Sequence, residues 1–184
     1  MRKGSNVCLL LLMVCAGALS LGSNVAAREG DDEGAIFALT NATAGNSVVV
    51  YARDEDGSLS PAGTYASGGN GTGAGLGSQG AVIVGEDHRF LFAVNAGSNS
   101  ISSFRIRRGT LQLLDTVPSG GIMPTSLAVR GGLLYVLNAG VPNNVVGFRV
   151  SPRGHLTQIA GSARPLSGAS TSTAQVGFND DATA

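Results

Sequence analysis

Few side chains in this sequence could transfer protons or coordinate a metal. The two histidines, His88 and His155, fall at turns, as do the acidic residues Asp54–Asp56 and Asp87. The acidic residues lack the spacing of a calcium-binding loop, and no grouping of His, Cys and carboxylates has the pattern of a transition-metal site. We therefore expect surface turn roles for all of them. The prediction is no metal and no cofactor, with the catalytic residues unassigned.

Asparagine recurs in a repeated phrase, where Asn41, Asn95 and Asn138 each close an apolar stretch. Recurrence in every repeat favours a structural turn role, because Asn tolerates left-handed backbone geometry and bonds to its own backbone. The alternative is that these amides contact a ligand. Arg164 is a further ligand-binding candidate, since a guanidinium could bind a carboxylate. These four residues could hold a carboxylate or a sugar, but they offer no ready general base.

The repeated phrase also predicts the elements that position these residues. Each copy has an apolar strand ending at the Asn, a strand with an aromatic residue (Tyr51, Phe104 or Phe148), and a Gly turn before a third strand. A repeat of roughly 40–55 residues made only of short strands indicates a propeller blade. We predict an all-β fold, a β-propeller of four-stranded antiparallel blades. The propeller is incomplete, with about three blades present.

The N-terminal segment is typical of a secretory signal peptide. Arg2 and Lys3 precede the apolar stretch Val7–Leu21, which is short for spanning a bilayer, and small residues lead to cleavage before Arg28. Both cysteines lie in this segment, so the mature chain is expected to have no disulfide. We predict a secreted protein with no membrane association after signal cleavage. The predicted parts are a signal peptide at 1–27, a leader at 28–34, and a partial propeller at 35–184.

The predicted partial propeller consists of separate blades, and the open sheet edges at its two ends could pair with another chain. The predicted parts are a blade at 35–66 without its first strand, blades at 80–118 and 124–161, and an orphan strand at 174–178. An orphan inner strand would leave unpaired backbone groups. We therefore expect a truncated product, or half of an assembly that self-associates through open sheet edges. The chain carries 12 basic and 12 acidic residues, and this balance argues against a nucleic-acid partner.

Propeller sites usually lie at one mouth of the central channel, and here the expected mouth loops are poor in ionisable groups. They contain no Asp, Glu, His or Lys, and Arg164 is their only charged residue. Gly71–Gly77 superficially resembles a nucleotide-binding loop, but no Lys-Ser/Thr follows it, so we interpret it as a mouth loop. The mouth loops are Thr40–Ser47, Ser67–Gly80, Ala96–Ser100, Pro118–Pro124, Ala139–Asn144 and Ser162–Thr173.

Three motifs carry a family resemblance: Gly75–Gly80 (GLGSQG), Glu86–Asn95 (EDHRFLFAVN) and Asn99–Phe104 (NSISSF). They resemble the lactonase-type seven-bladed β-propeller family, which includes bacterial 6-phosphogluconolactonases and fungal carboxymuconate cyclases. Family members are longer, so the chain matches an N-terminal half. The resemblance implies a lactonase-like protein whose ligand is a sugar lactone or a small carboxylate.

Three functional interpretations stay open from the sequence. The first is a lactonase-like propeller that acts on the lactone of a sugar acid or related carboxylate and is inactive as this fragment, because its mouth loops lack an acid or base. The second is a non-catalytic secreted propeller that binds a glycan, peptide or protein partner at the channel mouth. The third is a fragment without a stable fold.

Overall fold

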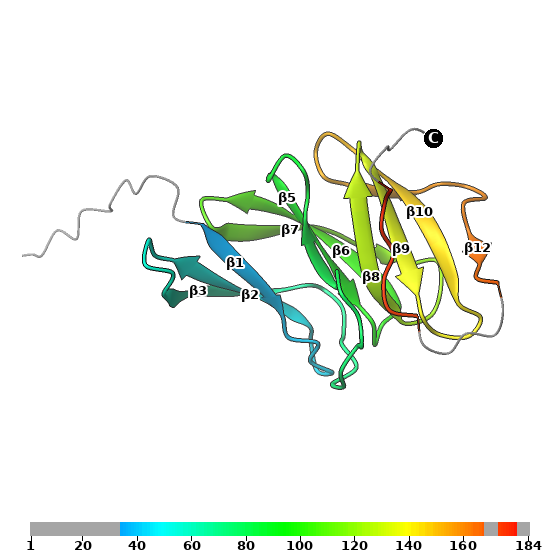
Figure 1. The fold of residues 1–184 in the computed structure, drawn as a ribbon, viewed down its shortest axis with the longest axis horizontal. Helices are drawn as coiled ribbons and strands as arrows, with labels where there is room; N and C mark the ends of the chain where they lie inside the picture. The colour runs from blue at the N-terminus through cyan, green and yellow to red at the C-terminus, as the bar shows by residue number, and fades with distance from the viewer. Residues whose placement is uncertain (1–33, 168–172, 180–184) are drawn as a thin grey trace, which may run out of the picture. The chain divides into compact units, whose positions relative to one another are not determined.

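The structure, a computed structural model, describes residues 34–167 and 173–179. The predicted signal peptide and most of the predicted leader therefore lie outside the described residues. The described chain forms three antiparallel sheets (Figure 1). The described residues contain no helix that is long and apolar enough to cross a membrane.

The first sheet contains β1 (Ala35–Leu39), β2 (Ser47–Arg53) and β3 (Leu59–Ala66), in that order. Its central strand alternates in burial, with Val48 and Val50 fully buried. This alternation of period two is typical of a strand with one face in a core. The outer strand, β3, is mostly exposed and carries Pro61, a residue that lacks the N–H a central strand would need.

The second sheet contains β4 (Val82–Val84), β5 (Phe90–Asn95), β6 (Ser100–Arg107) and β7 (Thr110–Pro118), in that order. Every residue of β5 is buried, because this strand packs on both faces. One face contributes Leu91 and Ala93 to a core shared with Val48, Val50 and Phe104. The other face contributes β5 residues to a second core, whose members are Phe90, Phe92, Val94, Ile101, Leu127, Leu134, Val136, Val146, Phe148 and Leu156.

The third sheet contains β8 (Pro124–Arg130), β9 (Leu133–Asn138), β10 (Asn144–Val150) and β11 (Leu156–Gln158). A fifth strand, β12 (Arg164–Pro165), pairs with the opposite half of β10. The sequence predicts a longer last strand, up to Ala160, and does not predict β12. In the structure, two short strands share the outer edge of β10. β11 pairs with Phe148–Val150, and β12 pairs with Asn144–Val145.

The predicted orphan strand at 174–178 is wrong, since residues 173–179 contain no β-strand. This segment nevertheless lies against the third sheet. The Val176 N–H donates to Ser126 Oγ at 3.3 Å, and Phe178 makes an edge-to-face contact with Tyr135. A strand requires a ladder of backbone hydrogen bonds to a neighbouring strand, and the described residues provide this segment with side-chain contacts instead.

The face-to-face packing of these sheets confirms the predicted fold class. The structure is all-β, with antiparallel four-stranded order in β4–β7 and in β8–β11. Residues from all three sheets pack together through the two faces of the middle one. This is the arrangement of consecutive blades in a partial propeller.

Candidate functional site

Asn95 is fully buried at the end of β5, and its amide is completely hydrogen-bonded. Its Oδ1 accepts hydrogen bonds from Asn46 Nδ2 at 3.0 Å and Ser67 Oγ at 2.6 Å. Its Nδ2 donates to Ser102 Oγ at 2.8 Å and Ser100 Oγ at 3.3 Å. An amide has two acceptor sites and two donors, so Asn95 has no free group for a ligand. It links the ends of the first two sheets.

Asn138 occupies the corresponding place in the third sheet, where it pairs with Asn144 as Asn95 pairs with Ser100. It is also fully buried, and its Nδ2 donates to Asn144 Oδ1 at 2.9 Å and to the Ser119 carbonyl at 3.3 Å. Its Oδ1 is buried without a hydrogen-bond partner among the described residues. Burial places this atom out of a ligand's reach.

Asn41 differs from the other two asparagines, so the predicted alignment of the three is off by one residue. The Thr40 N–H bonds to the Ser47 carbonyl, which makes Thr40 the counterpart of Asn95. Asn41 lies just beyond the strand with a φ of 53°. Its Nδ2 donates to Thr72 Oγ1 at 2.9 Å and to the Ala74 carbonyl at 2.6 Å. Left-handed geometry, the reason given for all three residues, applies to Asn41 and not to the two strand residues.

Arg164 lies apart from these asparagines, exposed on the outer strand β12. Its Nη1 donates to the carbonyls of Gly161 at 2.7 Å and Ala163 at 2.8 Å, so the guanidinium folds back onto its own segment. Its strand partner is Val145, and none of its hydrogen bonds reaches Asn41, Asn95 or Asn138. The structure does not assemble the four candidates into one site.

A hollow of about 460 Å³ lies beside Asn41 at this end of the first two sheets. Thr40 and Ser78 supply hydroxyl groups, and much of the remaining wall is backbone of the glycine-rich connection between the sheets. No lining side chain is ionisable, so the hollow suits a neutral, hydroxyl-rich ligand better than proton transfer. Its lining is Leu39, Thr40, Asn41, Ala42, Gly73, Ala74, Gly75, Leu76, Gly77, Ser78 and Ala81.

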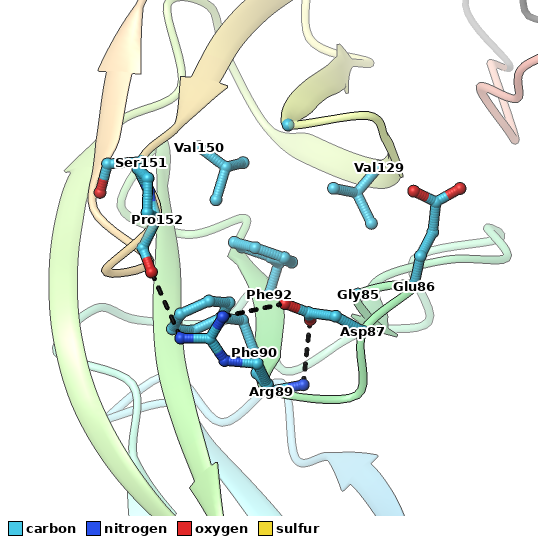
Figure 2. Close-up of a pocket in the computed structure, with 11 residues that line it drawn as sticks. Gly85, Glu86, Asp87, Arg89, Phe90, Phe92, Val129, Val150, Ser151 and Pro152 are labelled. Atoms are coloured by element: carbon cyan, nitrogen blue, oxygen red, sulfur yellow. Dashed lines mark hydrogen bonds and ion pairs between the residues drawn. The ribbon is translucent and has the colours of Figure 1, made fainter.

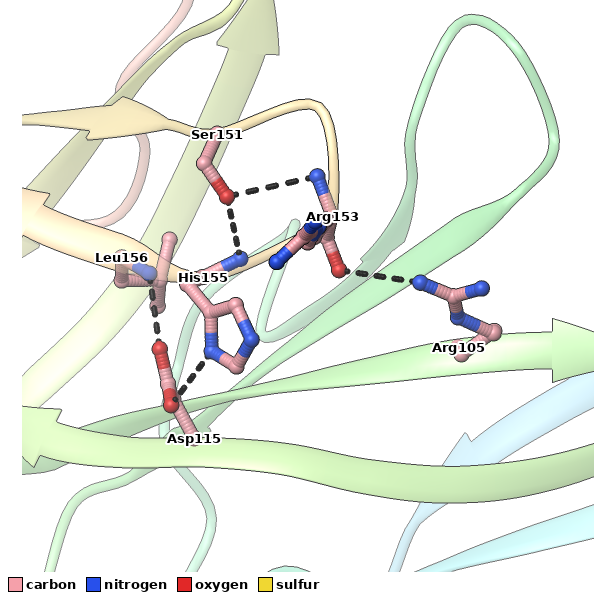
Figure 3. A network of polar contacts seen from close by, with 6 residues as sticks. All are labelled: Arg105, Asp115, Ser151, Arg153, His155 and Leu156. Carbon is pink, nitrogen blue, oxygen red and sulfur yellow. Dashed lines mark hydrogen bonds and ion pairs between the residues drawn. The ribbon is translucent and has the colours of Figure 1, made fainter.

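The opposite ends of the strands carry the charged groups. His155 Nδ1 lies 2.9 Å from Asp115 Oδ1, and Asp115 Oδ2 accepts the Leu156 N–H at 2.8 Å (Figure 3). Ser151 Oγ accepts the His155 backbone N–H at 3.0 Å, which closes the turn. His155 is thus an exposed turn residue with a carboxylate partner on β7. A carboxylate can orient an imidazole for acid–base chemistry, but neither residue lines the hollow beside Asn41, and the pair joins two sheets.

Sequence reasoning missed Asp115 because it lies 40 residues from His155 and belongs to no local motif. It also missed a second hollow, of about 310 Å³, between the second and third sheets. Figure 2 shows Arg89 beside Asp87 and reaching the Pro152 carbonyl, with Val129 and Val150 in the upper part of the view. The Arg89–Asp87 ion pair is 3.7 Å long and well exposed, so it contributes little to stability.

The acidic turn between β2 and β3 gives a pH-dependent prediction. The Ser58 N–H donates to Asp56 Oδ1 at 2.8 Å. Hydrogen bonds from the backbone and then the side chain of Ser58 lower the pKa of Asp56 below its ordinary value of 3.8. Since the folded pKa is the lower one, the stabilisation is present above pH 3.8 and is lost as the pH falls through the folded pKa.

We expect a carboxyl NMR titration to give a lower midpoint for Asp56 in the folded protein than in urea. Equal midpoints in the two states would contradict the inference that hydrogen bonds from Ser58 stabilise the ionised form of Asp56 in the folded turn.

The comparisons with known proteins agree with this architecture. The family model described as "Lactonase, 7-bladed beta-propeller" matches residues 32–169. No curated protein is similar enough to count as a relative. A functionally unknown protein from Desulfotomaculum acetoxidans is 24% identical with a TM-score of 0.52, over 61% of this chain and 34% of that one. The periplasmic gluconolactonase PpgL of Pseudomonas aeruginosa is 24% identical with a TM-score of 0.51, over 64% of this chain and 35% of that one.

A protein from Lactobacillus plantarum is 17% identical with a TM-score of 0.52, over 61% of this chain and 34% of that one. The chain spans about a third of the length of these three structures. They share its fold, and the family match covers most of its length. The chain belongs to the lactonase family of seven-bladed β-propellers.

Proposed function

We propose that this protein is a secreted lactonase-like propeller whose substrate is the lactone of a sugar acid or a related carboxylate. The observation that carries the proposal is the family match over residues 32–169. The signal-like segment at Val7–Leu21 supports secretion. One fold neighbour is named a periplasmic gluconolactonase, so a gluconolactone is the first substrate to test.

The hollow beside Asn41 is the binding site in this proposal. A sugar lactone is neutral and presents hydroxyls and a ring carbonyl, which match a wall of hydroxyl and backbone groups. Asn41 does not hydrogen-bond the ligand directly, because its amide is held by Thr72 and Ala74. Its role is to fix the wall of the hollow. Hydrolysis also requires a group that activates water, and the lining of this hollow does not supply one.

The test is the hydrolysis of glucono-1,5-lactone by the purified chain, followed as acid release at constant pH. The proposal requires a saturable rate above that of buffer, with the group that activates water coming from outside the lining of the hollow. This outcome would reverse the expectation from the sequence that the fragment is inactive. Ala42→Phe fills the hollow with a ring and should lower kcat/KM by about tenfold. The control, Arg164→Gln, alters an exposed side chain outside the hollow and should leave kcat/KM unchanged. A rate equal to that of buffer would contradict a lactonase activity of this chain.

The second candidate is a non-catalytic secreted propeller that binds a glycan, peptide or protein partner at the same end. The observation favouring it is the absence of ionisable side chains from the lining of the hollow in the described structure. Calorimetry separates the two functions. Saturable binding of the lactone or of a glycan without acid release, abolished by Ala42→Phe, supports the binding protein. Acid release that saturates supports the enzyme.

A further inference from the structure

Four arginines gather at the end of the second sheet, opposite the hollow beside Asn41. Arg89 comes from the turn before β5, Arg105 and Arg107 from the end of β6, and Arg108 from the turn that follows. With Phe90 and Ile106 they form the lining of a hollow of about 610 Å³. This arginine hollow is open, and its two apolar lining residues are Phe90 and Ile106. Every ionisable side chain in its lining is an arginine.

Two of these guanidinium groups are held in place by neutral partners. Arg89 Nη2 donates to the Pro152 carbonyl at 3.4 Å, and Arg105 Nη2 donates to the Arg153 carbonyl at 3.3 Å (Figures 2 and 3). Their Cζ atoms lie 5.2 Å and 5.7 Å from the centre of the Phe90 ring. A carbonyl and an aromatic face orient Arg105 without neutralising it, whereas Arg89 also pairs with Asp87. These contacts reduce the side-chain entropy that is lost when a ligand binds.

The positive charge of the arginine hollow is largely uncompensated. Within the described parts of the chain, the ion pairs join Arg89 to Asp87, Arg130 to Glu86, and His155 to Asp115. None of them involves Arg105, Arg107 or Arg108. Neighbouring like charges raise the local potential and attract anions, and the guanidinium fork pairs with the oxygens of phosphate or sulfate through two parallel hydrogen bonds.

The backbone at Arg108 is a second, independent observation. Arg108 and Gly109 have φ values of 47° and 73°, and they form the two-residue connection between β6 and β7. Both positive values correspond to a turn that favours Asn-Gly. Arginine adopts left-handed geometry at a cost that Asn largely avoids. The turn therefore holds a side chain that local backbone preference disfavours, and this side chain lines the arginine hollow.

We propose that the arginine hollow binds a doubly charged oxyanion, the phosphate or sulfate group of a small ester. Arg105 and Arg108 supply charge-assisted hydrogen bonds, and Arg89 and Arg107 add to the potential. The buried Phe90 ring supports the guanidinium groups of Arg89 and Arg105 above it. This site lies at the opposite strand ends from the hollow beside Asn41, and it does not depend on lactonase activity.

The test is calorimetric titration of the full chain with inorganic phosphate and inorganic sulfate, at constant ionic strength, with acetate as the singly charged control. We expect saturable binding of the doubly charged ions and at least about tenfold weaker binding of acetate. Glucose 6-phosphate and vesicles containing phosphatidic acid then separate a soluble ester from a lipid headgroup. No saturable binding, or equal binding of acetate, would overturn the proposal.

The variant Arg105→Gln/Arg108→Asn should weaken phosphate binding by about tenfold or more. Arg108→Asn alone suits the turn geometry, so its expected loss of about threefold cannot come from misfolding. Arg164→Gln removes one positive charge from an exposed site elsewhere and should change the affinity by less than twofold. An equal loss in this control would show that general charge, rather than the arginine hollow, attracts the ion.

Discussion

Replacement of Asn95 by alanine is expected to lower the free energy of unfolding by about 3 kcal/mol. The substitution removes the partner of Asn46 Nδ2 and Ser67 Oγ on one side and of two serine hydroxyls on the other. Asn95, Asn46 and Ser67 are all buried, so the groups that lose their partner cannot turn to water, and each unsatisfied group is costly. Urea unfolding followed by far-UV circular dichroism measures the loss.

Asn70→Ala is the matched control for this substitution. Asn70 is an exposed residue of the same end of the molecule, and its backbone makes hydrogen bonds that an alanine keeps. Asn70-Gly71-Thr72 is an N-glycosylation sequon, so both proteins are made without glycosylation. We then expect a change within about 0.5 kcal/mol for the control. Equal stability of the Asn95→Ala and wild-type proteins would show that the network is replaced by water at no cost.

Replacement of Gly71 by alanine is expected to cost about 3 kcal/mol as well, through overpacking. A Cβ at Gly71 would overlap the backbone carbonyl group of Asn41. Asn41 cannot yield easily, because its own side chain is bonded to Thr72 and Ala74 on the same loop. The substitution should therefore push the connection away from the first sheet. Since Asn41 and Gly73 line the hollow, ligand affinity should fall together with stability.

The same loop provides its own control at Gly75. A Cβ there would meet nothing within 4 Å, and Gly75 is not among the glycines with a positive φ. Gly75→Ala should therefore leave stability unchanged or raise it by about 0.5 kcal/mol, since alanine restricts the unfolded chain. Thermal unfolding of the two variants side by side tests the argument. Equal behaviour at Gly71 and Gly75 would mean that the loop moves freely.

Apolar stretches and glycine turns in the sequence predicted the strands and hairpins that depend on neighbouring residues alone. The apolar stretch that ends at Asn95 and the Gly turn at Gly109 predicted a strand and a hairpin, and both are present. The two-residue strand β12 was not predicted, because its existence depends on the free half of β10 rather than on its own residues. For the same reason, the apolar segment around Val176 appeared to be a strand, although no ladder forms there.

The candidate site was only partly visible in the sequence. Recurrence singled out Asn95 and Asn138, but their roles depend on partners that are distant in the chain, such as Ser67 and Ser119. The off-by-one alignment at Asn41 arose because Thr40 and Asn41 both follow the apolar stretch. The arginine hollow was not predicted, although Arg105, Arg107 and Arg108 stand close together in the sequence. Arg89 comes from a separate turn, and only the fold brings it to the end of β6.

The burial of β5 on both faces has a consequence for how the sheet finds its register. In a strand with one buried face, a slip of one residue exposes the apolar side chains to water. In β5 the same slip would move Phe92 into the core of Leu91 and Ala93, so hydrophobicity alone cannot oppose it. Asn95 can oppose it, because its hydrogen bonds to Asn46 and Ser67 form only when it faces the first sheet. The hydrogen bonds of Asn95 thus fix the pairing register of β5, which the apolar pattern of the strand does not specify.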